Sequence, residues 1–120
     1  MKAPIPRHEE DLVYEYIYGI YLIEELETNR LGFERLNFKI PEPYLDFIDQ
    51  RLRILRNEVR EMKKEMRQLK IRVIDPESDG IFSEYKYFAH GYEASFRFWE
   101  AAMRLEGTRR LMKYFFNSRG

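Results

Sequence analysis

Few side chains in this sequence of 120 residues could do chemistry. Its two histidines, His8 and His90, lie far apart in the chain and would have to meet across the fold to bind a metal ion. Carboxylates stand beside both, in HEED and HGYE, but the Glu-x-x-His motif of carboxylate-bridged metal sites does not occur. Because the chain has no cysteine, thiolate ligands and disulfides are excluded as well. The sequence therefore predicts no metal site and no cofactor.

Motifs for covalent or phosphate chemistry are also missing from the sequence. The serines are Ser78, Ser83, Ser95 and Ser118, and none of them lies in a Gly-x-Ser-x-Gly elbow. Neither a Gly-x-x-x-x-Gly-Lys loop nor a Gly-x-Gly-x-x-Gly loop is present. We therefore predict that the protein is not an enzyme and has no catalytic residues, which leaves functions that depend on binding another macromolecule.

The composition indicates one folded domain spanning residues 1–120. The chain is 44% hydrophobic, which is enough to bury a core. We expect the N-terminal segment 1–6 and the C-terminal segment 117–120 to be flexible. The N-terminus lacks the basic start and apolar core of a secretory signal, and the longest apolar run, LVYEYIYGIYLI, is too short for a membrane span. These features predict a cytoplasmic protein with no membrane partner.

The first helix is expected to begin after Pro6, where acidic residues complement the helix dipole, and to end near Asn29. It is apolar nearly all round, which is typical of a helix packed between two partners. Gly19 in its middle lowers helix stability, and this is tolerable if a neighbouring backbone approaches closely there. A second helix is expected to start at Pro41 and Pro43, since proline is tolerated in a first helical turn.

The second helix carries a heptad pattern. Its apolar residues follow one another at steps of three and four from Leu45 to Val73, which is typical of coiled-coil-like pairing. Such a helix would be longer than a compact domain of this size is wide. We therefore predict a homodimer whose seam consists of Leu52, Leu55, Val59, Met62, Met66 and Leu69. The alternative is that the first helix folds back onto this seam inside one chain, which would bury the same residues without a dimer.

The remainder of the chain is expected to add a β-hairpin and two helices. β-Branched and aromatic runs flank the turn-forming DPESDG, so the hairpin is predicted in KIRVIDPESDGIFSEYKYF. From Gly91 onward a helical spacing is indicated by Tyr92, Phe96, Trp99 and Met103. Gly107 is expected to interrupt this helix before a last helical segment, RRLMKYFF. The predicted fold is α+β, mainly α: a helix, a long heptad-patterned helix, a β-hairpin and two C-terminal helices.

Several segments resemble a small uncharacterised protein family of Bacillus-type bacteria, whose members have about this length. The likeness rests on KIPEPYLDFID at the start of the long helix, KIRVI at its end, EYKYFAHGYE, and the C-terminal LMKYFF. Similar proteins have Asn-Pro after the aromatic segment, where this chain has RFWEAAM, so the start of the last helix is expected to differ. The resemblance implies a bacterial intracellular origin and brings no established activity.

The aromatic stretch EYKYFAHGYEASFRFW is richer in rings than one side of a small core absorbs easily. Exposed Tyr, Trp and Arg side chains together are typical of interface hot spots. We therefore predict a dimeric regulatory or adaptor protein, whose unknown protein partner contacts Tyr85, Tyr87, Tyr92, Phe96 and Trp99. The alternative is that most of these rings are core or dimer contacts.

A DNA-binding regulator is the alternative function. The formal charge is balanced, with 21 basic and 21 acidic side chains, but residues 41–74 hold nine basic and six acidic ones. Nucleic-acid contacts are predicted for four side chains outside the seam, which are Arg53, Arg60, Lys64 and Arg67. The hairpin is expected to serve as a wing-like arm, and Arg109 and Arg110 as a second contact. Against this, glutamates are interleaved at spacings that form ion pairs within a helix, as on an ordinary solvated face. The sequence has no helix-turn-helix, zinc-finger or RNP pattern.

Overall fold

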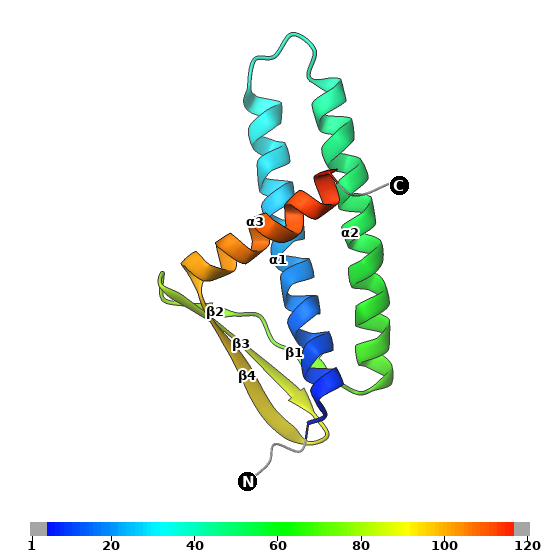
Figure 1. Cartoon of the computed structure of the whole chain (residues 1–120), viewed down its shortest axis with the longest axis vertical. Helices are drawn as coiled ribbons and strands as arrows, with labels where there is room; N and C mark the ends of the chain where they lie inside the picture. The colour runs from blue at the N-terminus through cyan, green and yellow to red at the C-terminus, as the bar shows by residue number, and fades with distance from the viewer. Residues whose placement is uncertain (1–4, 117–120) are drawn as a thin grey trace.

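The computed structural model describes residues 5–116, and in this range the chain forms three helices and four strands. In chain order they are α1 (Arg7–Arg35), α2 (Glu42–Gln68), β1 (Arg72–Val73), β2 (Glu77–Ser78), β3 (Phe82–Ala89), β4 (Tyr92–Trp99) and α3 (Glu100–Phe116). α1 and α2 form a long antiparallel hairpin, the sheet lies toward the N-terminal end of α1, and α3 crosses the helical hairpin (Figure 1). The predicted α+β, mainly α fold class is confirmed.

Both long helices begin at prolines, as predicted. The carbonyl of Pro6 accepts hydrogen bonds from the amides of Glu9 and Glu10, while α2 has Pro41 at its cap and a second proline in its first turn. α1 continues past its expected end near Asn29 to Arg35, because the RLGFER segment that follows has no proline and its arginines, leucine and glutamate favour a helix despite Gly32.

The chain ends were expected to be flexible from 1 to 6 and from 117 to 120. Ile5 is instead buried in the hydrophobic core, at 6% exposure, so the anchored part of the chain begins before α1. Residues 1–4 and 117–120 lie outside the described residues. The prediction for those two segments therefore stays a prediction.

The seam of α2 packs against α1 of the same chain. Leu52, Leu55, Val59 and Met66 are buried within the single chain, and Met62 and Leu69 are half-buried. Gly19 of α1 lets the two helices approach closely, as expected, because a Cβ atom built there would lie 2.5 Å from Cγ2 of Val59. The intrachain alternative is therefore the observed arrangement, and this seam gives no structural reason for a dimer. The homodimer itself stays a prediction.

A four-stranded antiparallel sheet replaces both the expected hairpin and part of the expected helix. The main hairpin is β3–β4, whereas β1 and β2 are two-residue strands that pair with opposite ends of the same edge of β3. The prediction of a helix from Gly91 was wrong, since residues 92–99 form β4. Their exposure alternates, with Ala94, Phe96 and Phe98 turned inward. The two-residue turn that joins the strands has positive φ at both positions, 54° at His90 and 78° at Gly91, as such tight hairpins require.

One C-terminal helix, α3, takes the place of the two that were predicted. Gly107 does not interrupt it, because this glycine is buried against α1 and a Cβ atom there would lie 2.8 Å from a ring carbon of Tyr21. Thr108 donates a hydrogen bond to the carbonyl of Arg104 inside the helix and caps no new segment.

Two hydrophobic clusters make up the core, and α1 contributes to both. The first joins α1 to the sheet and centres on Val13, Ile17, Tyr85 and Tyr87. The second joins α1 to α2 and α3 and contains Leu22, Leu26, Ile48, Leu52 and Leu55. The sheet covers one side of α1, and α2 covers another. This explains why α1 is apolar nearly all round.

Candidate functional site

The five aromatic residues predicted to bind a partner divide into core and surface. Tyr85 and Tyr87 are 4% and 1% exposed and pack on α1, so the prediction that they contact a partner was wrong. Burial raises the pKa of Tyr85 to about 12, as expected for a phenol removed from water. Phe96 is half-buried in a stack with Tyr87. Only Tyr92 and Trp99 are exposed, and they lie at opposite ends of β4.

A compact group of side chains surrounds Trp99 on the outer face of the sheet, and we call Phe82, Arg97 and Trp99 the Trp99 cluster. Phe82 and Trp99 are paired across β3 and β4, and the guanidinium of Arg97 lies 4.1 Å from the centre of the Phe82 ring. Trp99 is 58% exposed, and the neighbouring Ile81 is equally accessible. The cluster thus presents aromatic, apolar and cationic groups to solvent at one end of the hairpin.

The four cations predicted to contact nucleic acid all lie exposed on α2. The interleaved glutamates were expected to pair with them, yet within residues 5–116 no carboxylate lies within ion-pair distance of Arg53, Arg60, Lys64 or Arg67. Arg60 instead donates a hydrogen bond to Asn57, and Glu58 accepts one from Tyr114. These four side chains are therefore available to a ligand.

The two histidines meet at a single buried carboxylate. Glu9, which is 4% exposed, lies 2.7 Å from Nε2 of His90 through one oxygen and 3.8 Å from Nε2 of His8 through the other. The contact fastens the β3–β4 turn to the first turn of α1. In the part of the chain that the structure describes, no group of three or more histidine or carboxylate side chains could hold a metal ion.

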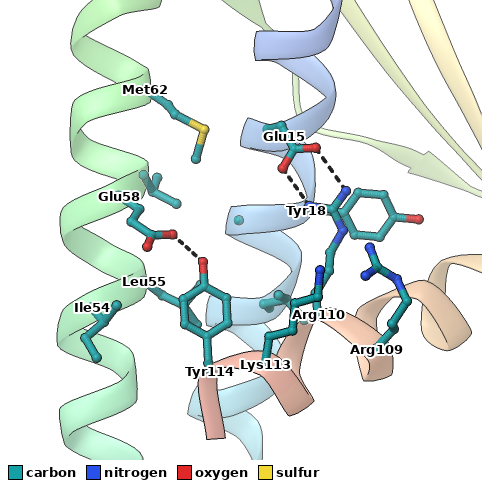
Figure 2. A pocket seen from close by; sticks show the side chains of 13 residues that line it. Glu15, Tyr18, Ile54, Leu55, Glu58, Met62, Arg109, Arg110, Lys113 and Tyr114 are labelled. Atoms are coloured by element: carbon teal, nitrogen blue, oxygen red, sulfur yellow. Dashed lines mark hydrogen bonds and ion pairs between the residues drawn. The ribbon is translucent and has the colours of Figure 1, made fainter. Parts of the chain in front are cut away.

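A groove of about 530 Å³ opens between the three helices (Figure 2). Its floor is mainly apolar and consists of Tyr18, Gly19, Leu22, Leu55, Val59 and Met62, while Glu15, Glu58, Arg109, Arg110, Lys113 and Tyr114 provide polar groups around it. The carboxylates of Glu15 and Glu58 already accept hydrogen bonds from Arg110 and Tyr114. Among residues 5–116, no histidine or serine lines the groove.

Arg110 and Tyr114 of α3 clamp this helix onto the helical hairpin, because they lie one turn apart and reach α1 and α2 respectively (Figure 2). Arg110 donates to Glu15 at 2.7 and 3.0 Å and to Glu106 at 2.7 Å, and its guanidinium lies 4.4 Å from the centre of the Tyr18 ring. The hydrogen bonds from Arg109 and Arg110 lower the pKa of Glu106 to about 2, and the hydrogen bond from Arg110 lowers the pKa of Glu15. Burial and the hydrogen bond to Glu58 raise the pKa of Tyr114.

Sequence reasoning missed Phe82, Arg97 and the α3 clamp. The signal for the first two was the strand alternation of residues 92–99 behind a His-Gly turn, which sets Phe82 opposite Trp99. No comparable signal marks the clamp, because the position of Arg110 beside Glu15 depends on the angle at which α3 returns across α1.

The comparisons with known proteins agree with the resemblance drawn from the sequence. A family model described as YhjD protein matches residues 4–119. A protein of Bacillus subtilis (strain 168), titled "Uncharacterized protein YhjD", is 27% identical over 106 residues, which cover 88% of each chain. No solved structure matches the chain. Among residues 5–116, none of the helices has the length and hydrophobicity needed to cross a bilayer. By this family match the chain belongs to the YhjD protein family.

Proposed function

We propose that the protein is a non-enzymatic adaptor or regulator of the cytoplasm, and that it binds another protein through the Trp99 cluster. The observation that carries the proposal is the 58% exposure of the single tryptophan beside Phe82 and Arg97. Tryptophan, tyrosine and arginine dominate the energetics of protein interfaces. A large aromatic side chain held in solvent on a regular strand is therefore best explained by a partner that covers it.

The strand geometry supports this use of the Trp99 cluster. Trp99 is the last residue of β4, its partner Phe82 is the first of β3, and the amide of Glu100 donates to the carbonyl of Ile81 at 2.8 Å. Paired backbones thus hold the cluster in place, which lowers the conformational entropy that binding would otherwise cost.

Trp99→Ala is expected to weaken partner binding about thirtyfold, the effect of removing a typical hot-spot side chain. The experiment is an affinity capture from a Bacillus-type lysate, followed by titration of the captured partner against purified wild-type and variant proteins. Tyr92→Ala is the matched control, because Tyr92 is 53% exposed on the same strand but lies at its other end. The proposal is wrong if Trp99→Ala retains every partner, or if both variants lose the same partner equally.

A second candidate function, DNA binding through α2, is favoured by four cations of this helix that lack a carboxylate within ion-pair distance among residues 5–116. Among the described residues, Arg53, Lys64 and Arg67 have no acidic partner, so a phosphate would have no protein carboxylate to displace. Arg60, Lys64 and Arg67 follow Arg53 by seven, eleven and fourteen positions. These spacings are close to whole helical turns, so the four cations lie on one face of α2.

An electrophoretic shift with duplex DNA at low and at high salt tests this second candidate. Release of counterions should make the affinity fall steeply with salt, and Arg60→Ala with Lys64→Ala should flatten that dependence by about one slope unit for each lost phosphate contact. Lys39→Ala serves as the control, because this exposed lysine lies between α1 and α2, away from the four cations. Absence of any shift at low salt would eliminate DNA binding.

A further inference from the structure

Among the described residues 5–116, β4 is paired along only one of its edges. β3 lies at the centre of the sheet, with β1 and β2 on one side and the full length of β4 on the other. Within residues 5–116 no strand pairs with the far edge of β4, and Figure 1 shows β4 at the outside of the molecule, away from α2. An unprotected edge of eight residues is a template for another strand, and proteins usually block or occupy such an edge.

The hydrogen-bond register identifies which residues present free backbone groups at this edge. The carbonyl of Lys86 accepts a hydrogen bond from the amide of Ile74, so the backbone groups of Lys86 point toward β1. Lys86 faces Ser95 of β4. Because the backbone groups of Lys86 point toward β1, Lys86 and Ser95 form a non-hydrogen-bonded pair, and the amide and carbonyl of Ser95 point away from β3. The same alternation turns the backbone groups of Glu93 and Arg97 outward.

We propose that this edge pairs with the same edge of a second copy of the chain, antiparallel and about a two-fold axis at Ser95. In this register Ser95 faces Ser95, while Glu93 of each copy faces Arg97 of the other. The three residue pairs would exchange about six backbone hydrogen bonds, two for each pair. The inference does not depend on the partner proposed for the Trp99 cluster.

Charge favours this register, because it sets Glu93 opposite Arg97, whereas a shift of the axis by one residue sets one of these two charges opposite Ser95. Shifting the two-fold axis by two residues in one direction sets Glu93 against Glu93, and shifting it in the other direction sets Arg97 against Arg97. Opposite charges that face each other across strands are stabilising, whereas like charges are destabilising. Glu93, Ser95 and Arg97 are all exposed on the outer face, so the side chains can meet without disturbing the core.

The inner face is also compatible with this pairing. Ala94 and Phe96 are half-buried in the single chain and would face Phe96 and Ala94 of the second copy, which pairs a small with a large apolar side chain. The seam of α2, in contrast, is already covered by α1. A dimer of this chain therefore has a ready site at β4 and none on the heptad seam.

Light scattering of the full chain over a wide range of concentration tests the proposal. The wild type is expected to approach twice its 14.8 kDa mass as concentration rises. Glu93→Arg and Arg97→Glu should each weaken self-association at least tenfold, because each sets like charges opposite one another twice in the dimer. Mixing the two variants should restore a dimer, since every substituted side chain then faces an opposite charge. This restoration also shows that both variants are folded.

Two controls separate edge pairing from a general effect of charge or strand damage. Lys86→Glu makes the same change in charge as Arg97→Glu on the neighbouring strand and should leave the dimer intact. Ser95→Pro removes an amide that is not bonded to β3 and should give a folded monomer, as judged by circular dichroism. A wild type that stays monomeric at every concentration overturns the proposal, and so does a dimer that persists unchanged in Glu93→Arg and Arg97→Glu.

Discussion

Tyr87→Ala is expected to lower the free energy of unfolding by about 3–5 kcal/mol, the usual cost of truncating a fully buried aromatic side chain. Tyr87 is 1% exposed, and its ring stacks on Phe96 with 5.6 Å between the ring centres. It lies where the inner face of the sheet meets α1, so neighbouring side chains cannot close the cavity without moving the helix. Urea unfolding of the purified variant, followed by circular dichroism, measures the loss.

Trp99→Ala is the comparison for this measurement, because it removes an even larger ring from the same hairpin. Its expected cost is only about 0.5 kcal/mol, as for other exposed positions. The two substitutions therefore separate core from docking surface within a stretch of aromatics that looks uniform in the sequence. If Tyr87→Ala lowered the free energy of unfolding no more than Trp99→Ala does, Tyr87 would not be packed between the sheet and α1 as described.

Arg110→Met is expected to lower the free energy of unfolding by about 2 kcal/mol at neutral pH, because hydrogen bonds between charged groups are stronger than those between neutral groups. The loss is not larger because Glu15 is half-exposed, and solvent weakens its ion pair with Arg110. Arg110 is mostly shielded from solvent, with 17% of its side chain exposed, and it joins α3 to α1 through Glu15. Methionine keeps much of the contact with the Tyr18 ring and removes the ion pairs. Urea unfolding over a series of pH values measures both the loss and its pH dependence.

Acid should remove part of the stability that Arg110 provides. The pKa of Glu106 is lowered in the folded state from 4.5 to about 2, and the pKa of Glu15 is lowered too. A carboxyl with a lowered folded-state pKa stabilises the fold above its unfolded value, and this contribution is lost as the pH falls from about 4.5 toward 2. Arg110→Met should make this acid loss smaller, because it removes the main cause of the lowered Glu15 pKa and part of the cause for Glu106. Arg109→Met should reduce mainly the part that comes from Glu106, whose pKa the hydrogen bond from Arg109 lowers most. Parallel pH curves for the wild type and Arg110→Met would contradict the clamp.

Helical periodicity and the prolines at the helix starts were sufficient to predict α1 and α2, because each helix carries a long apolar pattern. It could not identify what covers the heptad seam of α2. A stripe such as Leu52, Leu55 and Val59 fits a helix of its own chain or of a second chain equally well, and the chain-length argument favoured the wrong one. The deciding contact is a single close approach between the two helices: Gly19 lets α1 lie against Val59 at a distance that a larger residue would prevent.

The segment from residue 92 to 99 was misread because two periodicities coincide there. Tyr92, Phe96 and Trp99 are spaced as on one face of a helix, yet Phe96 and Phe98 also alternate as in a strand. The third inward-facing residue is Ala94, whose small side chain makes this alternation hard to recognise in the sequence. The turn was missed for a related reason, because His90 adopts the positive φ that asparagine or glycine more often supplies at a hairpin. The Trp99 cluster and the free edge of β4 both follow from this strand, so neither could be predicted before it was recognised.

The sharing of α1 between the two hydrophobic clusters has a consequence for how the molecule melts. An elongated body, here 59 × 32 × 21 Å, could come apart in stages if each end had a core of its own. Val13 and Ile17 of α1 hold the sheet, and Leu22 and Leu26, on the next turns of the same helix, hold α2. Loss of either cluster would destabilise the helix on which the other is built, so we expect the two ends to unfold together in one cooperative transition.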